Sequence, residues 1–450
     1  MACALLVGCV SAVALAGCGG DRLPVRDYAA DREFVVRYRE ATVEIARRKM
    51  AEVEAGVKAS PTVVPTGRRL ATGGKFGGFF LWDSVFGVMW ARYLEEKDFP
   101  CLSTLDNFYA LQPESGLVSR EYTADGRPTT SESHPMTFAP PLLSWAEAEL
   151  WRCGRSDRSR LARVYPHLKA HHEACRRNFR RADGLYFGDV WGCGMDDIPR
   201  WPRGSSDAEI REGGIPFTED SLCPAWKDKW GWMSLETLKW SWNRQAGWID
   251  MSATMAFDCL NLAKIADALG LAGEAAAFRA EHAELARTIN AKCWDDERGF
   301  YFDVTDAGRI DRWFVGAYWT LIAKVASPAQ ARRMIEKLSD PGFFGTPVPV
   351  PSLAASDPDF EPETGYWRGA VWPPTTYMTI CGLREYGFTK EAEAIARRWY
   401  NANAEFFVRT GTVWENLPPD QCVKMKRRSG RDFCGWSALA PIALPAEFGW

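Results

Sequence analysis

Residues 251–289 read MSATMAFDCLNLAKIADALGLAGEAAAFRAEHAELARTI, and this stretch decides the fold class. Each half repeats apolar residues at the spacing of one helical face, and Gly270 between the halves is typical of a helix C-terminus. The two halves therefore predict an antiparallel helical hairpin with a very short turn. The two faces consist of Met251, Met255, Leu262, Ile265 and Leu269, and of Ala275, Phe278, His282, Leu285 and Ile289.

The same pattern recurs elsewhere in the chain. A helix after Trp372 ends at Tyr386-Gly387, and Thr389 is the expected cap of the next helix, while another hairpin surrounds Cys153-Gly154. About a dozen helices are expected between residues 26 and 444, with short strands near 185–190 and 299–304. We therefore predict an all-α fold, an (α/α)6 barrel of six helical hairpins with long irregular loops and a few short strands. An open solenoid is disfavoured because no repeat of about 34 to 47 residues is present.

Composition restricts the class of partner. The 450 residues are 46% hydrophobic and 25% charged, with a formal net charge of −3. This composition supports a large core, and it lacks the basic excess typical of nucleic-acid binding. We expect a neutral substrate and no nucleic-acid partner.

The first twenty residues, MACALLVGCVSAVALAGCGG, are uncharged and apolar or small, as in the core of a signal peptide. Residues 15–18, Leu-Ala-Gly-Cys, resemble a bacterial lipobox, although no Lys or Arg precedes the apolar run. We expect residues 1–20 to be removed from the fold and residues 21–450 to form a single barrel domain. The predicted location is that of an exported lipoprotein, periplasmic or at the cell surface, with its only membrane contact a lipid anchor at Cys18; plain secretion and a cytoplasmic N-terminus are the alternatives.

The least regular stretch lies between residues 181 and 248 and is rich in tryptophan. Indole faces stack on the C–H faces of pyranose rings, so the stretch suits a sugar site, although an aromatic mini-core is the other interpretation. Within it, residues 194–201 read GMDDIPRW, and a carboxyl group buried among aromatic rings gains the raised pKa that a general acid needs. An Asx-type turn is the alternative for Asp196 and Asp197. The tryptophans are Trp191, Trp201, Trp226, Trp230, Trp232, Trp240, Trp242 and Trp248.

The GMDDIPR segment resembles the acid-bearing segment of glycoside hydrolase family 63, which includes processing α-glucosidase I, and is similar to the Ser-Gly-Trp-Asp segment of trehalases. The resemblance implies an (α/α)6 barrel in which Asp196 is the general acid. It also implies that Asp197 and Trp201 lie at the substrate.

Residues 73–76, GGKF, followed by Trp82-Asp83-Ser84, resemble the N-terminal trehalase signature and imply a sugar-binding role for Asp83, with Phe76 and Trp82 beside it. Lys75 and Gly78 stand where trehalases have Arg and Glu, which disfavours trehalose as the substrate. An N-cap of the following helix is the alternative for Asp83. Residues 116–121, GLVSRE, are similar to a further family segment and add Arg120 and Glu121 as substrate-binding candidates.

Residues 366–374, YWRGAVWPP, resemble the Y-W-R-G-x-x-W pattern of family 63, whereas trehalases carry Asp at the position of Arg368. An Arg fork can bind two hydroxyl groups or hold a carboxylate, so Arg368 is a candidate pocket residue and a structural salt bridge is its alternative. The same segment adds Trp367 and Trp372 to the substrate-binding candidates.

Residues 412–418, TVWENLP, resemble the base-bearing loop of the family and imply that Glu415 is the general base, with Trp414 at the substrate. The resemblance covers residues 73–436. Inversion of configuration is implied, which corresponds to carboxyl groups roughly 6.5 to 9.5 Å apart.

The sequence thus predicts an inverting, exo-acting glycoside hydrolase that cleaves an α-linked glucoside or a related small sugar and needs no metal or cofactor. A trehalase, a non-catalytic carbohydrate-binding lipoprotein, and a lyase or epimerase using His134 are the alternatives. His167 and His171 lie one helical turn apart but lack a third ligand. A cluster of aspartates around Gly299 is interpreted as parts of solvated turns rather than as ligands of a calcium ion. The cluster comprises Asp295, Asp296, Asp303 and Asp306.

Overall fold

The structure, a computed structural model, describes residues 26–59, 68–74, 76–124, 126–128, 139–188, 192–206, 208–209, 245–363, 366–420 and 429–450. The predicted signal peptide with its lipobox, Lys75, His134, Trp191 and the tryptophans between residues 226 and 242 lie outside these residues.

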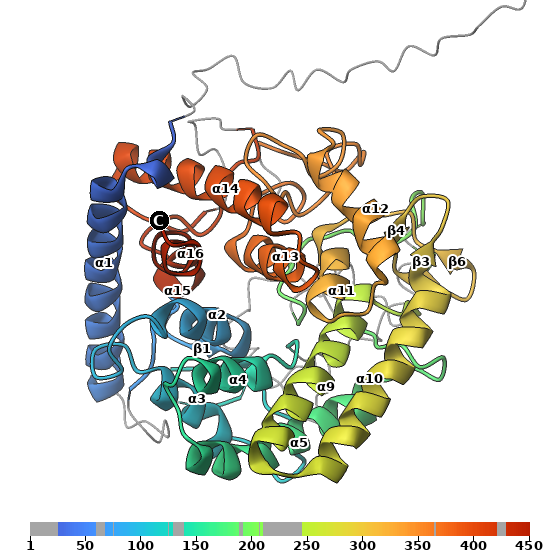
Figure 1. Cartoon of the computed structure of the whole chain (residues 1–450), viewed down its shortest axis with the longest axis horizontal. Helices are drawn as coiled ribbons and strands as arrows, with labels where there is room; N and C mark the ends of the chain where they lie inside the picture. The colour runs from blue at the N-terminus through green and yellow to red at the C-terminus, as the bar shows by residue number, and fades with distance from the viewer. Residues whose placement is uncertain are drawn as a thin grey trace, which may run out of the picture.

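The described helices form two concentric rings (Figure 1). The outer ring contains α1 (Arg32–Ala59), α3 (Cys101–Ala110), α5 (Arg158–Phe179), α10 (Ala272–Cys293), α12 (Pro328–Ser339) and α14 (Thr389–Thr410). The inner ring contains α2 (Leu81–Ala91), α4 (Leu143–Arg152), α9 (Ile249–Leu269), α11 (Trp319–Ile322), α13 (Pro373–Glu385), α15 (Cys434–Ser437) and α16 (Leu444–Phe448). Two 3-10 turns, Tyr28–Ala30 and Val315–Tyr318, and a π-helical segment, Leu439–Ala443, complete the helical elements described.

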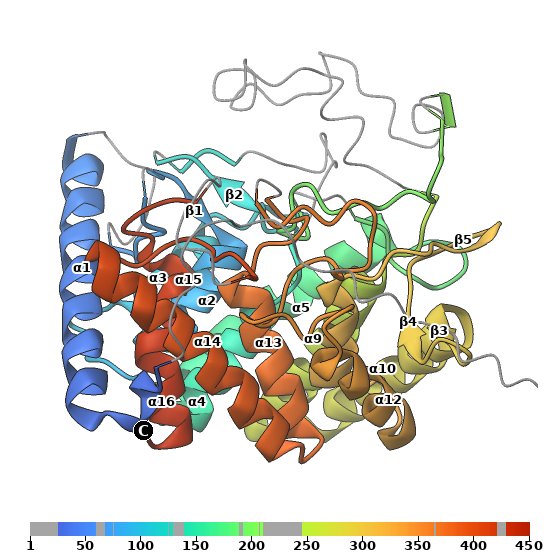
Figure 2. The ribbon, with the colours of Figure 1, turned by 90° about the horizontal axis from the view of Figure 1, so that it is seen from above.

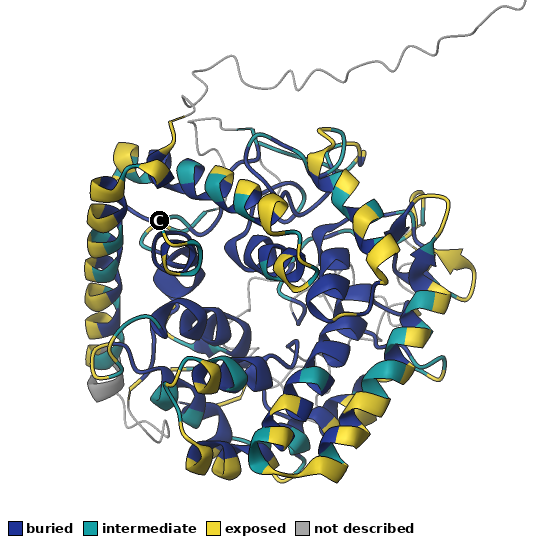
Figure 3. Cartoon of the chain, in the orientation of Figure 1, coloured by how far each residue is buried: buried dark blue, intermediate teal, exposed yellow. Residues whose placement is uncertain are grey.

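The inner ring is closed by side-to-side contacts. Successive inner helices touch in the order α2, α4, α9, α11, α13 and α15, and α15 returns to α2. Every residue of α2 is buried, whereas the outer helices expose one face (Figure 3). A helix with apolar residues on all sides can bury them only when other helices surround it, and the outer ring provides this environment. The predicted (α/α)6 barrel is therefore confirmed.

The three hairpins predicted from periodicity are present. Gly270 ends α9 with a φ of 77° and lets α10 begin two residues later, because this left-handed conformation suits glycine. The pairs α4–α5 and α13–α14 are joined by similarly short turns. One detail was wrong: Phe388 occupies the N-cap position of α14, so Thr389 is its first residue rather than its cap.

The strands are short antiparallel pairs. They are β1 (Phe79–Phe80) with β2 (Glu121–Tyr122), β3 (Trp294–Asp295) with β4 (Phe300–Tyr301), and β5 (Val304–Thr305) with β6 (Gly308–Arg309). The strands expected near 299–304 are therefore present. In the stretch 185–190, Tyr186 forms an isolated bridge with Arg180, and residues 189 and 190 are not described. Figure 2 shows β1, β2 and long connecting segments gathered over one end of the helices.

Within the described part of the chain, no helix combines the length and the hydropathy needed to cross a membrane. The cysteines that the structure describes are all unpaired, and most are buried.

A buried arginine joins the first and last parts of the ring. Arg92, at the end of α2, lies 2.6 Å from Glu149 of α4 and 3.0 Å from Glu447 of α16, and its side chain is 3% exposed. Its guanidinium also donates to the hydroxyl of Tyr377 on α13 at 3.2 Å. Two further hydrogen bonds join early and late parts of the chain. The indole of Trp90 donates to the carbonyl of Gly435, and the hydroxyl of Tyr28 donates to Glu405.

Replacing Arg92 by Met should lower the free energy of unfolding by about 3 to 5 kcal/mol, because Glu149 and Glu447 would both lose the buried guanidinium that they share. Urea titration followed by circular dichroism measures this loss. Arg384→Met is the matched control, since Arg384 also pairs with Glu447 but is 40% exposed, and about 1 kcal/mol or less is expected there. Equal losses in the two variants would contradict the assignment of Arg92 to ring closure.

Candidate active site

The backbone of the segment that carries Asp196 packs against the indole ring of Trp82. Gly194 has a φ of 81°, and a Cβ at this position would lie 3.0 Å from the ring of Trp82 on α2. Only glycine fits this close approach. Trp82 is itself buried and packs against Trp319 at a centroid distance of 5.3 Å. The predicted Trp82 thus supports the backbone of the acid-bearing segment.

The other end of this segment is fixed by charge. Arg200 pairs with Asp250 at 2.5 Å and with Asp303 at 2.9 Å, and all three side chains are buried. Its guanidinium lies between the rings of Trp248 and Phe314, at 4.0 and 4.3 Å from their centroids. The interpretation of Asp303 as part of a solvated turn was therefore wrong. Because Asp250 lies in the first turn of α9, Arg200 attaches the acid-bearing segment to the inner ring.

Asp197 connects the acid-bearing segment to a second loop. Its carboxylate accepts the backbone N–H of Trp367 at 2.5 Å and lies 3.4 Å from Nε of Arg368. Arg368 is 37% exposed and also pairs with Glu361 at 2.7 Å. Both the pocket role and the salt-bridge alternative for Arg368 are compatible with this position.

The loop that contains Trp367 and Arg368 also carries Tyr366. Trp367 and Trp372 are buried and stack in parallel with centroids 3.9 Å apart, and the Trp372 indole donates to the carbonyl of Tyr366 at 3.1 Å. The Tyr366 ring also packs edge-on against Trp372 at 4.6 Å. The two tryptophans therefore hold Tyr366 in place. They do not offer an exposed stacking face.

Glu415 is held at both carboxylate oxygens. Tyr366 donates its hydroxyl to Oε1 at 3.0 Å, and the backbone N–H of Gly430 donates to Oε2 at 2.8 Å. Gly430 suits this contact because a Cβ there would lie 3.3 Å from Oε2. Burial raises the pKa of Glu415, and the hydrogen bonds from Gly430 and Tyr366 oppose the rise because they stabilise the ionised form. The neighbouring Trp414 donates its indole N–H to Thr410.

Asp83 lies in the first turn of α2, which begins directly after β1. The N-cap position belongs to Phe80, so the N-cap interpretation of Asp83 was wrong. Burial is the main cause that raises the pKa of Asp83 well above its ordinary value, and the nearby charges of Glu415 and Asp196 raise it further, while Arg120 opposes them. The same charges of Glu415 and Asp196 also raise the pKa of Tyr366, after burial. The charges of Asp196 and Glu415 thus act on both Asp83 and Tyr366, and we call this group of three carboxyl groups and Tyr366 the carboxylate pocket.

The remaining candidates divide between the carboxylate pocket and other places. Arg120 is fixed next to α2 by the hydrogen bond from the N–H of Leu81 to its carbonyl, and its guanidinium lies 3.4 Å from the buried Glu121. Phe76 is 41% exposed and packs edge-on against Phe80 and Phe433. Trp201 instead lines a separate cavity of about 540 Å³ together with Arg181 and Thr305.

Sequence reasoning missed Tyr366, Gly430 and Arg200. Tyr366 opens the YWRG segment and Arg200 closes the GMDDIPR segment, so both stood inside quoted motifs. The roles assigned within these motifs went to their tryptophans and acidic residues instead. Gly430 had no such signal, because its contact with Glu415 depends on how the chain returns after residue 420.

A ring of paired helices with three carboxyl groups close enough for their charges to interact is the arrangement expected of a glycoside hydrolase of the helical-barrel class. Residues 79–436 match the family described as the mannosylglycerate hydrolase MGH1-like glycoside hydrolase domain, and the chain belongs to this family. The match covers most of the chain, including all three carboxyl groups of the pocket. Residues 79–436 thus form a glycoside hydrolase domain of the family 63 type.

Three relatives illustrate the similarity. A mannosylglycerate hydrolase of Rubrobacter radiotolerans is 36% identical over 140 residues, which are 30% of this chain and 31% of the relative. A cytosolic neutral trehalase of Neurospora crassa is 31% identical over 134 residues, which are 29% of this chain and 18% of the relative. The aligned segments thus cover less than a third of either relative's own length. The crystal structure of a family 63 mannosylglycerate hydrolase from Thermus thermophilus in complex with glucose has a TM-score of 0.66 and 22% identity, covers 88% of this chain and 99% of that one, and shares the fold.

The raised pKa of Asp83 predicts a stability that depends on pH. The folded state keeps the proton of Asp83 at pH values where the unfolded chain has lost it, so stability falls as pH rises above the ordinary pKa of 3.8. Asp83→Asn should remove this loss and raise the free energy of unfolding at pH 7 by on the order of 1 kcal/mol. Thermal unfolding at pH 4 and pH 7 measures the effect. Asp306→Asn, at a fully exposed position, is the control, and a less stable Asp83→Asn protein at pH 7 would contradict the prediction.

The hydrogen bond from Tyr366 predicts a shift in the pH profile. The hydroxyl stabilises the ionised form of Glu415, so Tyr366→Phe should raise the pKa of Glu415 further above its ordinary value of 4.5. If Glu415 acts as a base, the acidic limb of kcat/KM moves to higher pH in this variant, and the maximal rate falls by about tenfold, the equivalent of one hydrogen bond of about 1.4 kcal/mol. An unchanged acidic limb would show that Tyr366 does not control Glu415.

Proposed function

We propose that the protein is an inverting, exo-acting α-glycosidase with Asp196 as the general acid and Glu415 as the general base. The observation that carries the proposal is that the acid-bearing segment and Glu415 meet at neighbouring residues, since Asp197 accepts the N–H of Trp367 and Glu415 accepts the hydroxyl of Tyr366. The charges of Asp196 and Glu415 also act on the buried Asp83. A protein that only binds sugar has no need for two such carboxyl groups beside a third. This convergence favours catalysis over the non-catalytic alternative.

In the proposed reaction, Asp196 donates a proton to the glycosidic oxygen while the bond from that oxygen to the anomeric carbon breaks. Glu415 removes a proton from a water molecule whose oxygen attacks the anomeric carbon from the opposite face. The hydrogen bonds from Tyr366 and Gly430 fix the carboxylate of Glu415 in position for this step. A preorganised base needs no rearrangement as the transition state forms.

Asp83 takes the role of sugar binding in this proposal. Its raised pKa keeps it protonated over a wider pH range than an ordinary Asp, so it can donate a hydrogen bond to a sugar hydroxyl. A neutral Asp83 also avoids a third negative charge beside Asp196 and Glu415. The burial of Asp83 and Glu415 supports a pocket that accepts one end of a substrate, as exo-action requires.

The proposed substrate is an α-linked glucose or mannose with a small polar aglycone, and mannosylglycerate and short α-gluco-oligosaccharides are the first compounds to test. The matched family and the Rubrobacter relative support the former. Trehalose is disfavoured because Lys75 and Gly78 replace the Arg and Glu of the trehalase signature.

The decisive experiment measures the hydrolysis of mannosylglycerate, kojibiose, nigerose, maltose, isomaltose and trehalose, with the released anomer followed by NMR. We expect the released anomer to be β for at least one substrate. Asp196→Asn and Glu415→Gln should each lower kcat by about 10² to 10⁴, the usual contribution of one acid or base group.

Glu361→Gln is the matched control, because Glu361 is a 42% exposed carboxylate that pairs with Arg368, and near-normal rates are expected from it. An α anomer as the first product would overturn the inverting mechanism. Normal rates in both pocket variants would remove the assignment of Asp196 and Glu415.

A further inference from the structure

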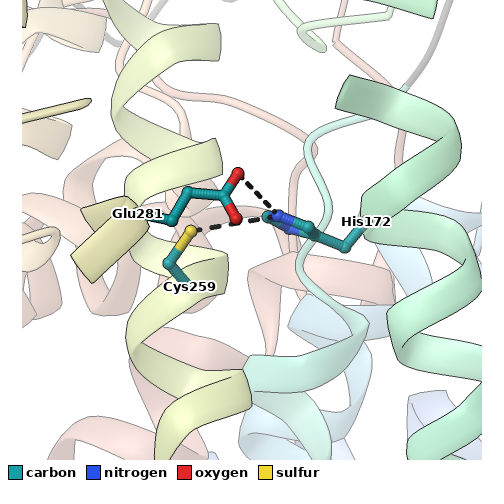
Figure 4. A group of neighbouring side chains, drawn as sticks. All are labelled: His172, Cys259 and Glu281. Atoms are coloured by element: carbon teal, nitrogen blue, oxygen red, sulfur yellow. Dashed lines mark hydrogen bonds and ion pairs between the residues drawn. The ribbon is translucent and has the colours of Figure 1, made fainter. Parts of the chain in front are cut away.

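A group of potential metal ligands lies between α5, α9 and α10, among residues that play no part in the carboxylate pocket. His172 of α5, Cys259 of α9 and Glu281 of α10 point toward one another (Figure 4). Nε2 of His172 is 3.2 Å from a carboxylate oxygen of Glu281 and 4.0 Å from the sulfur of Cys259. The ligand atoms of all three residues lie within 4.8 Å of one another.

These separations are close to those of a tetrahedral zinc site. Bond lengths of about 2.0 to 2.3 Å and tetrahedral angles place a nitrogen and an oxygen ligand about 3.4 Å apart, and a nitrogen and a sulfur ligand about 3.6 Å apart. The separation of His172 from Glu281 is already near that value, and that of His172 from Cys259 exceeds it by a few tenths of an ångström.

A carboxylate behind His172 selects which ring nitrogen faces the group. Asp258 lies 2.7 Å from Nδ1 of His172 and is itself hydrogen-bonded by the hydroxyl of Ser144. When Nδ1 carries the proton that Asp258 accepts, Nε2 is left with its lone pair directed at Cys259 and Glu281. A carboxylate that orients a histidine in this way is the usual partner of a metal-ligating imidazole.

We propose that Nε2 of His172, the thiolate of Cys259 and the carboxylate of Glu281 bind a zinc ion. One sulfur, one imidazole and one carboxylate form a donor set that suits zinc better than magnesium or calcium, which prefer oxygen ligands alone. His172 and Cys259 are buried, whereas the Glu281 side chain is 23% exposed, so the fourth position opens toward solvent on that side and a water molecule fills it. Such an ion would tie α5 to the α9–α10 hairpin.

This site differs from the one considered from the sequence, and it departs from the expectation that no metal binds. His167 and His171 do not form a site together, because His167 is hydrogen-bonded to Gln112 and His171 accepts the N–H of Val118. The alternative for the new group is a metal-free chain in which His172 bridges Asp258 and Glu281, with Arg176 3.7 Å from Glu281. The two arrangements are distinguished by direct metal binding.

The test uses the purified full chain after treatment with a chelator. We expect one Zn²⁺ per chain in calorimetry and a higher melting temperature when Zn²⁺ is added. Co²⁺ in place of Zn²⁺ should give a thiolate-to-cobalt absorption band in the near ultraviolet. Cys259→Ser should abolish the band, and Glu281→Gln should keep it while lowering zinc affinity by about tenfold or more, since it removes one charged ligand.

Cys175→Ser is the matched control, because Cys175 is equally buried on α5 but contacts His171 instead, and it should keep the band. Glu281→Gln preserves side-chain shape at a partly exposed position, so it answers the question even if Cys259→Ser fails to fold. Zinc binding absent from the unmodified chain, or a cobalt band that survives Cys259→Ser, would overturn the proposal in favour of the metal-free chain.

Discussion

The ion pairs of Arg200 with Asp250 and Asp303 are the constraint on which the site depends. Asp250 belongs to the first turn of α9, and Asp303 also accepts the N–H of Ile249 at 2.8 Å. The start of an inner helix, the strand region near residue 304 and the acid-bearing segment therefore meet at one guanidinium. A buried charge without its partners is costly, so this arrangement tolerates no alternative register of the segment. Because Asp196 and Asp197 lie only a few residues before Arg200, their positions are fixed as well.

The carboxylate pocket shows how one environment separates three similar groups. Asp196 and Glu415 lie near enough to Asp83 for their charges to raise its pKa, because ionised carboxylates close together repel one another. Hydrogen bonds from Tyr366 and Gly430 favour the ionised form at Glu415. Burial is the main cause that favours the neutral form of Asp83. Differences in hydrogen bonding, rather than in residue type, thus distinguish Asp83 from Glu415.

The sequence was a good guide to what is local. The hairpins at residues 251–289 and 373–406 follow from apolar periodicity and glycine stops, which act within a few turns of helix. The motif resemblance brought Asp83, Asp196 and Glu415 forward together, and in the structure the charges of Asp196 and Glu415 both act on Asp83. Contacts between segments that are distant in the sequence could not be predicted from it. The acidic run around Gly299 looked like solvated turns, yet Asp303 faces a guanidinium about a hundred residues earlier in the chain. Tyr366 had no visible link to Glu415 until the fold brought their two loops together.

The contacts that close the ring near Arg92 have a consequence for folding. They join residues that are very far apart in the chain, since 355 residues separate Arg92 from Glu447 and 345 separate Trp90 from Gly435. Local helical hairpins form early, whereas contacts of such separation form late because the intervening chain must first be ordered. On the ribosome, the apolar surfaces of the inner helices therefore stay without their last neighbours until α16 has emerged. An incomplete ring of this kind exposes apolar helix surface, which favours aggregation.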